Sequence, residues 1–564
     1  MTSAITANTD HGVAVSTNES EWQLGTDSGL PVMPPVEPEP QRDRSLERLE
    51  RPLHTLTAEH CGWLLLIAYA AFSRFAWLSA RPLDAGEATR ALAMLSGYSG
   101  AVNLAPQPGW VNLITAALSA LGASAWSMRF VPAFCGLMLI AVAFGLRRYI
   151  GRAGGLALAL LLTLSPGFAY YARADAPEMP TALMALLTLY AFCILAEHPA
   201  TARATWLGIV IGLLSAAAPE GRVIEVSFIL ALAVIGLYCL AARQHSLLNI
   251  KVWFKRHGGL LLIVVITTLL AWFASAFFAS VPAEFASSDS AIQQAGGSLG
   301  LIAAVHSYLP ALALDEFLIV LTAIVGIAAV LSARLRSILA AWVALWTLFS
   351  IILALMLPTD IANLTLMLLP MAVLGALGIE WLHHTNAWPV VRVVVGVLAV
   401  LTLYVQILTN FIYYAPDASE AAWNRHANLY WSGLTTTIQT PLYCRRAMAG
   451  ITPADATSYF HLEAPAVRWY LRGLRPVKNP AIAAVDVRPP LAGRGPEGGS
   501  GGSAGLRRFD FDYAVTWPLT WSSLTPTSAL RYIFTDEAWV RPLAAPITIT
   551  SRPSNPPALT GLDE

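Results

Sequence analysis

The stretch CGWLLLIAYAAFSRFAWLSA (61–80), continued at once by RPLDAGEATRA (81–91), decides the fold of this chain. The first segment is almost entirely apolar, and it is long enough for a helix that crosses a bilayer, which needs about 17–25 residues. The second segment places two acids, Asp84 and Glu87, directly where the chain leaves the apolar run. We therefore expect a membrane helix followed by a polar turn that carries carboxylates on one side of the membrane.

The composition extends this expectation to the whole chain. Of the 564 residues, 56% are hydrophobic and only 12% are charged, and the mean hydropathy is +0.57. Soluble proteins carry about 25% charged residues, so we predict a mainly α-helical, polytopic membrane protein. The formal net charge is zero and no nucleic-acid module is recognisable, so we expect no nucleic-acid partner.

Further apolar runs are long enough to cross the membrane, which gives about eleven spans in all. They lie at 128–146, 153–171, 178–196, 204–219, 224–241, 258–279, 313–332, 337–357, 362–382 and 390–413. The shorter run GWVNLITAALSALGAS (109–124) is interrupted by polar residues. We expect this run to lie along the membrane surface.

Lysine and arginine set the orientation of these spans, because cytoplasmic loops carry an excess of both. With residues 109–124 on the surface and residue 60 inside, the inner loops hold eleven such cations and the outer loops five. We predict a multi-pass protein of the plasma (inner) membrane with a cytoplasmic N-terminus. The outer cations are Arg81, Arg90, Arg129, Arg173 and Arg222.

The chain divides into three predicted parts. Residues 1–58 are polar and proline-rich, and we expect a disordered cytoplasmic tail. Residues 59–413 are the transmembrane domain, and residues 414–564 are a small extracytoplasmic α/β domain with a flexible loop near 491–506. In that domain, APAVRWYLRGL is predicted as a helix, and AIAAVDV, FDFDYAVTW, ALRYIFT and PITITSR as strands.

Asp84 and Glu87 admit two interpretations. Their spacing is that of a capping box, in which each side chain bonds the other residue's backbone N–H at a helix start. Alternatively, one of the carboxylates is a general base that acts on an acceptor hydroxyl. Taken alone, the two residues do not decide between a structural and a catalytic role.

Other outer segments offer basic groups that suit a phosphate. In SPGFAYYARADAPEMP (165–180), Arg173 is placed to hold a phosphate and Asp175 to orient a hydroxyl, unless the two are simply a solvated pair. Arg222 lies in PEGR, which is also typical of a tight turn. Arg74 lies inside the first span, where snorkelling is the structural alternative to substrate binding.

Two further acids favour a structural role, and no motif points to a bound cofactor. Asp315 and Glu316 are expected to begin a helix, where acids complement the helix dipole. No metal-binding or nucleotide-binding motif is present, so we expect no cofactor and no metal.

The order of these features resembles the GT-C superfamily of polyprenyl-phosphate-sugar-dependent glycosyltransferases. An acidic first outer loop is followed by the pattern G.S.W..R, an inner turn flanked by arginines, and LSPGFAYYARADAPEM. The chain is most similar to the protein O-mannosyltransferase and lipid A aminoarabinose transferase branch. Within that branch, LSPGFAYYARADAPEM and APAVRWYLRGL resemble a bacterial and archaeal group associated with flippase activity. The resemblance covers residues 60–415 in architecture and is most specific over 74–180.

The resemblance implies a reaction and a set of site residues. Family members use an Asp–Glu pair in the first outer loop, with the Asp as general base. Glu87 matches the Glu, Gly86 occupies the Asp position, and Asp84 is the candidate substitute. The family's His/Lys-Pro-Pro motif matches Gln107, and a basic residue of a later turn matches Arg222. The implied reaction moves a sugar from a polyprenyl-phosphate lipid to a glycan, lipid or protein acceptor on the outer face.

Two alternative functions stay open at this point. The departures at Gly86 and Gln107 favour a catalytically inactive relative that binds polyprenyl-linked lipid or assists glycan export. The other alternative is a secondary transporter. Against it, the sequence shows neither evident repeats nor clearly broken helices with buried acids at the membrane midplane.

Overall fold

The structure is a computed structural model that describes most of the membrane part and several segments of the C-terminal region. The described residues are 58–96, 109–216, 219–243, 247–278, 308–332, 338–356, 364–385, 388–411 and shorter segments between 435 and 551. The tail predicted at residues 1–58, apart from its last residue, and the loop predicted near 491–506 lie outside them.

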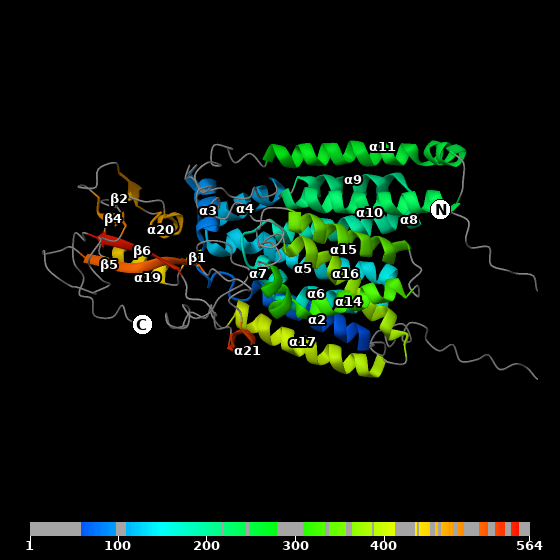
Figure 1. The fold of residues 1–564 in the computed structure, drawn as a ribbon. Helices are drawn as coiled ribbons and strands as arrows, with labels where there is room; N and C mark the ends of the chain where they lie inside the picture. Colours follow the sequence, from blue (N-terminus) through cyan, green and yellow to red (C-terminus); the bar gives the residue numbers. More distant parts are fainter. Residues whose placement is uncertain are drawn as a thin grey trace, which may run out of the picture. The chain divides into compact units, whose positions relative to one another are not determined.

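The membrane part is built of long helices that run side by side (Figure 1). The helices are α2 Ala58–Phe75, α3 Ala85–Ser96, α4 Gly109–Leu121, α5 Ala125–Ile150, α6 Arg152–Leu164, α7 Pro166–Ala172, α8 Glu178–Glu197, α9 Thr201–Ser215, α10 Pro219–Arg243, α11 Leu247–Phe278, the π-helix η2 Ala311–Asp315, α14 Phe317–Leu331, α15 Ile338–Met356, α16 Leu364–His383 and α17 Trp388–Asn410.

Every apolar run predicted to cross the membrane falls on helical structure. Within the described residues, six helices are long and apolar enough to cross a membrane, and two bent helix pairs raise the number to eight. The mainly helical, multi-pass architecture is therefore confirmed, while the larger span count stays a prediction. Helix α4, in the run 109–124, has 13 residues. At about 1.5 Å per residue it is roughly 20 Å long, which is short of the ~30 Å hydrocarbon core.

Two helix breaks meet inside the membrane part. Helices α6 and α7 bend by 63° at Ser165, and the helix that ends in η2 bends by 90° into α14 at Glu316. The buried Glu316 carboxylate joins the breaks, because its Oε1 accepts hydrogen bonds from Ser165 Oγ (2.7 Å) and the Gly167 N–H (2.8 Å). Asp315 and Glu316 precede α14 as expected. The structure therefore contains two broken helices joined by a buried acid, which the sequence does not show.

Helices α14 and α16 approach closely because glycines line their interface. A Cβ at Gly326 would lie 2.2 Å from the Leu374 carbonyl oxygen, and one at Gly378 would lie 2.6 Å from the Gly326 nitrogen. Side chains of α16 are buried along nearly its whole length. This helix therefore lies at the centre of the described bundle.

Residues 435–551 contain a six-stranded mixed sheet in the order β1-β5-β6-β4-β2-β3. The strands are β1 Thr435–Thr436, β2 Thr457–Phe460, β3 Arg475–Pro476, β4 Val485–Arg488, β5 Arg507–Thr516 and β6 Leu543–Ser551. Strand β2 pairs in parallel with β3 and β4, and the other pairs are antiparallel. Helices α19 Gln439–Met448 and α20 Pro465–Tyr470 pack with the sheet around a core that includes Cys444, Val467, Val485 and Ile549.

One of the segment predictions in this region was wrong. APAVRWYLRGL contains helix α20, and AIAAVDV, FDFDYAVTW and PITITSR coincide with β4, β5 and β6, but ALRYIFT lies in helix α21 Pro526–Thr535. A reciprocal cap begins this helix, because Thr525 Oγ1 accepts from the Ser528 N–H (3.2 Å) and Ser528 Oγ accepts from the Thr525 N–H (2.8 Å). The cap outweighs the strand preference of the aromatic and β-branched residues that follow.

Candidate functional site

Helix α3 begins at the acid pair. The Glu87 N–H donates to Asp84 Oδ1 (2.8 Å), and the Asp84 N–H donates to Glu87 Oε2 (3.1 Å). The capping box expected from the spacing is therefore confirmed. Asp84 is only partly buried, and its second carboxylate oxygen accepts no hydrogen bond from the residues that the structure describes. Asp84 thus combines a capping role with an open acceptor atom.

Glu87 is also the centre of a buried charge network. Its side chain is 1% exposed and forms ion pairs with Arg129 and, at 3.2 Å, with Arg81. Arg129 Nε donates to Glu87 Oε1 at 2.9 Å, and the Asp175 N–H donates to the same oxygen at 2.7 Å. Both carboxylate oxygens are occupied, so Glu87 holds the segment between α2 and α3 to α5 and to the turn after α7.

The pKa values of the two acids shift in opposite directions. Burial alone would raise the pKa of Glu87, but the charges of Arg129 and Arg81 outweigh burial and hold this pKa well below its ordinary range. Burial raises the pKa of Asp84, and the negative charge of Glu87 raises it further. A carboxylate locked in its ionised form is a poor proton acceptor, whereas a raised pKa improves a general base. Of the two predicted catalytic acids, Asp84 is the better placed.

Asp175 forms an ion pair with Arg90 of helix α3. Arg90 Nε lies 2.8 Å from Asp175 Oδ2, and Arg90 also donates to the Asp175 backbone carbonyl. Burial raises the pKa of Asp175, and the charge of Arg90 opposes this effect. Because Asp175 and Arg173 are only 2% and 7% exposed, the alternative of a solvated Arg173–Asp175 pair was wrong. The pair with Arg90 is a second link between α3 and the turn after α7.

Arg129 and Arg173 bind backbone carbonyls at the end of α2 and just beyond it. Arg129 is fully buried and donates, over 2.8–3.1 Å, to the carbonyls of Leu78, Arg81 and Pro82. Arg173 donates to the carbonyls of Ser73 (3.1 Å) and Ala76 (2.6 Å). The last carbonyls of a helix have no partner within the helix, and Arg173 satisfies that of Ser73. Arg129 instead holds the segment that follows the helix.

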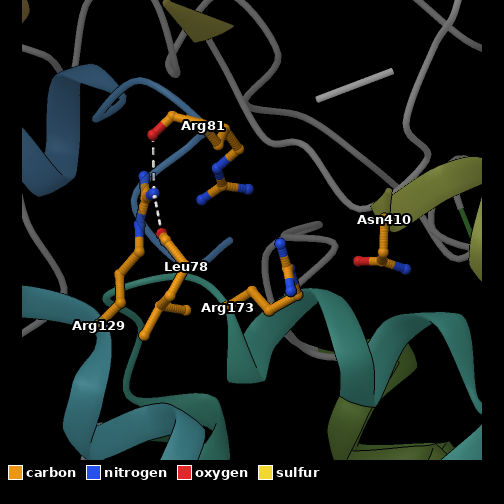
Figure 2. Close-up of a pocket in the computed structure, with 5 residues that line it drawn as sticks. All are labelled: Leu78, Arg81, Arg129, Arg173 and Asn410. Carbon is orange, nitrogen blue, oxygen red and sulfur yellow. Dashed lines mark hydrogen bonds between the residues drawn. The ribbon is translucent and has the colours of Figure 1, made fainter. Parts of the chain in front are cut away.

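Three arginines surround a pocket beside this network (Figure 2). It is lined by Leu78, Arg81, Arg129, Arg173 and Asn410. Figure 2 shows the Arg81 and Arg173 side chains reaching into the same space from different segments, with Asn410 of α17 beyond them. The charged residues of the lining are all arginines, and Arg81 and Arg129 both pair with Glu87. Such a pocket suits a phosphate group, which arginine binds through paired N–H donors.

The structure does not bring every predicted site residue to this pocket. Arg74 is fully buried within the bundle, donates to the Leu162 carbonyl at 2.8 Å and does not line the pocket. Arg222 is exposed on α10 and does not line it either. Gln107 lies outside the described residues. Arg173 is the predicted substrate-binding residue that does line the pocket.

Sequence reasoning missed Arg81, Arg129 and Asn410 as site residues. Arg129 carried a signal, because it ends the pattern G.S.W..R and is a charge within an apolar run, which by default marks a functional candidate. Arg81 stands directly beside the acids in RPLDAGEATRA. Asn410 carried no signal, since only the fold brings it to the arginines.

The cations of this site are side chains of the protein itself. Among the residues that the structure describes, no group of three or more histidine, cysteine, aspartate or glutamate side chains is arranged to hold a metal ion.

Part of this chain matches the model of a known sequence family, and its fold is similar to that of solved structures. Residues 103–272 match the family model described as dolichyl-phosphate-mannose-protein mannosyltransferase. The fold is similar to that of ArnT from Cupriavidus metallidurans in the apo state, with 15% identity and a TM-score of 0.51, over 76% of this chain and 93% of that one. ArnT from the same organism bound to undecaprenyl phosphate matches with 15% identity and a TM-score of 0.50. This match covers 88% of this chain and 99% of that one. The resemblance to the GT-C superfamily is confirmed.

The family match covers only some of the residues of the candidate site. The family match covers the chain from α4 into α11 and so includes Arg129, Arg173 and Asp175, whereas Asp84 and Glu87 precede it. No curated protein matches the chain significantly. At 15% identity, the similarity to ArnT shows a shared fold alone. The chemistry of the site therefore rests on the geometry of its own residues.

Proposed function

We propose that this protein is a membrane glycosyltransferase that moves a sugar from a polyprenyl-phosphate donor to an acceptor on the extracytoplasmic face. The observation that carries the proposal is a cationic pocket joined through Glu87 to the open carboxylate of Asp84. The GT-C fold supports it, and one of the similar ArnT structures is bound to undecaprenyl phosphate. The acceptor is a hydroxyl group of a glycan, a lipid or a protein.

Asp84 is the proposed general base of this reaction. Its carboxylate takes the proton of the acceptor hydroxyl while the hydroxyl oxygen attacks the anomeric carbon. The bond from that carbon to the phosphate oxygen breaks, its electron pair leaves with polyprenyl phosphate, and the anomeric configuration inverts. Arg81 and Arg173 stabilise the charge on the departing phosphate. No cofactor is part of the proposal, because arginines supply the cationic groups.

The proposed topology places this site at the outer edge of the bilayer of the plasma (inner) membrane. We propose about eleven spans, with residues 1–58 as a cytoplasmic tail and residues 59–413 as the transmembrane domain. Residues 414–564 are proposed as the extracytoplasmic α/β domain, which the sheet and core of residues 435–551 support. In this orientation, Arg81, Arg129 and Arg173 all lie on the outer side.

A catalytically inactive relative that binds polyprenyl-linked lipid, or assists glycan export, is the second candidate. The observation that favours it is the engagement of Glu87, since Arg129, Arg81 and the Asp175 N–H occupy both of its carboxylate oxygens. Only Asp84 is then available as a base. In this alternative the arginine pocket binds lipid phosphate without transfer.

Sugar transfer from a panel of radiolabelled polyprenyl-phosphate sugars, in mixed detergent–lipid micelles, distinguishes the two candidates. We expect transfer by the wild type, and we expect Asp84→Asn to lower the rate roughly a hundred- to ten-thousand-fold while lipid-phosphate binding persists. Arg222→Ala is the control, since Arg222 does not line the pocket. Saturable binding with no transfer from any donor by the wild type would contradict the enzyme and support the lipid-binding relative.

A further inference from the structure

Three aromatic side chains form a partly exposed cluster beside the arginine pocket. Phe72 on α2 and Trp77 just after α2 are 52% and 62% exposed, and Phe411 directly follows α17. The rings of Phe72 and Phe411 stack with 5.8 Å between centroids and 14° between planes. Trp77 meets both rings edge-on, at 6.0 Å and 6.2 Å. Together, Phe72, Trp77 and Phe411 form an apolar surface that we call the aromatic cluster.

Arg173 joins the aromatic cluster to the pocket. Its guanidinium lines the pocket, lies 4.6 Å from the centroid of the Phe411 ring and donates to the Trp77 carbonyl at 3.4 Å. The backbone makes the same connection, because the pocket-lining residues Leu78 and Asn410 are the chain neighbours of Trp77 and Phe411. An apolar surface and a cationic pocket therefore adjoin each other.

Trp77 holds its exposed ring on an unusual backbone. Its φ of 50° lies in the left-handed region, and no other non-glycine residue that the structure describes has a positive φ. Bulky residues rarely adopt this region, and such strain gathers at ligand-binding sites. An exposed tryptophan does not require this backbone conformation, because Trp126 is 44% exposed within the regular helix α5.

The cluster also lies at the ends of two helices that expose apolar side chains. Helices α2 and α17 are neighbours, linked by a hydrogen bond from the Tyr69 hydroxyl to Gln406 Oε1 at 2.8 Å. Both expose large apolar side chains along their length, such as Leu65 (69%) and Val397 (63%). A hydrocarbon chain in the bilayer can therefore reach the aromatic cluster along these two helices.

We infer that the aromatic cluster binds the phosphate-proximal part of the polyprenyl chain of a lipid whose phosphate occupies the arginine pocket. The inference rests on the proposed function and names the residues that select the hydrocarbon part of the substrate. The chemistry of the two parts matches, since the anionic head meets arginines and the adjoining hydrocarbon meets aromatic faces. The bilayer is the proposed source of this ligand, because the cluster lies at the ends of two helices with exposed apolar side chains.

Binding of undecaprenyl phosphate, compared with that of the short-chain analogue geranyl phosphate and of inorganic phosphate, tests the inference. We expect the wild type to bind both lipids more tightly than inorganic phosphate. Trp77→Ala and Phe411→Ala should each weaken binding of both lipids roughly tenfold and leave inorganic phosphate binding unchanged. Trp126→Ala removes an exposed aromatic ring away from the pocket and should change neither. Thermal unfolding of each variant shows whether it is folded.

The outcomes separate this inference from the proposed function. If folded Trp77→Ala and Phe411→Ala variants bind both lipids as tightly as the wild type does, the aromatic cluster is not the chain-binding surface, although the phosphate pocket stands. If the wild type itself binds neither lipid, the proposed function fails and this inference fails with it.

Discussion

The Glu87 carboxylate and the Arg129 guanidinium form an ion pair in which the two side chains are 1% and 0% exposed. The pair joins helix α3, which follows the first predicted span, to helix α5. It also separates two roles within one short loop. Glu87 holds the segment in place, whereas the second carboxylate oxygen of Asp84 accepts no hydrogen bond from the residues that the structure describes.

Removal of Arg129 should destabilise the protein strongly. Arg129→Ala leaves the Glu87 charge buried without its main partner, and breaking a buried pair on one side costs about 3–5 kcal/mol. The matched control is Arg148→Ala, which breaks the pair with Glu197 in which the side chains are 64% and 32% exposed. An exposed pair contributes about 0–1 kcal/mol. Unfolding in detergent micelles measures both losses of free energy, and equal losses would contradict a structural role for the buried pair.

The pH dependence of transfer should report the raised pKa of Asp84. A general base must be ionised, so kcat/KM should fall as the pH drops through the pKa of Asp84. That fall should begin at a higher pH than for an ordinary aspartate with a pKa of 3.8. Asp84→Asn should remove nearly all transfer without unfolding α3, because asparagine caps helices as well as aspartate does. A wild-type pH profile with no acidic limb above that of an ordinary aspartate would count against Asp84 as the base.

Arg173 and Arg222 should differ in their effect on phosphate binding. The sequence predicts both as phosphate ligands, but only Arg173 lines the pocket. Hydrogen bonds to charged groups contribute about 1.5–3 kcal/mol, so Arg173→Ala should weaken binding of undecaprenyl phosphate roughly ten- to a hundredfold. Arg222→Ala should leave the affinity unchanged. Calorimetric titration in micelles distinguishes them, and the reverse order of effects would move the phosphate to Arg222 on α10.

Tyr470 should stabilise the start of helix α3. Its hydroxyl accepts a hydrogen bond from the Leu83 N–H at 3.2 Å, and Trp469 of the same helix α20 packs in one apolar cluster with Leu83 and Ala88. Tyr470→Phe should therefore speed hydrogen exchange of the backbone amides of the first turn of α3. Tyr404→Phe is the control, because the Tyr404 hydroxyl bonds the Phe534 carbonyl of α21 instead. Unchanged exchange in Tyr470→Phe would show that α20 does not hold the acid-bearing loop.

The part of the site that could be predicted from the sequence is the local part. The capping box at Asp84 follows from residues three positions apart, which a sequence displays directly. The remaining partners of Glu87 do not follow in this way, because Arg129 and the Asp175 N–H are 42 and 88 positions away. Arg74 shows the same limit. The sequence reveals a charge inside a span, but not that the Leu162 carbonyl, 88 positions away, accepts its hydrogen bond.

The fold shows the same division between local and distant information. The apolar runs place the membrane helices because each helix is defined by its own residues. The helix breaks at Ser165 and Glu316 are far apart in the sequence, and a hydrogen bond between these two side chains joins them. The sequence does not show that the two breaks meet. In ALRYIFT, the aromatic and β-branched residues favour a strand, and the cap that makes it a helix lies just before the segment, at Thr525.

The central claim is that the pocket of Arg81, Arg129 and Arg173 binds the phosphate of a polyprenyl lipid. An electron cryo-microscopy structure of the wild-type protein with undecaprenyl phosphate tests this claim most directly. We predict density for the phosphate within hydrogen-bond distance of the Arg81 and Arg173 guanidinium groups. A phosphate bound elsewhere, such as at Arg222, with no density between the three arginines, would contradict the claim.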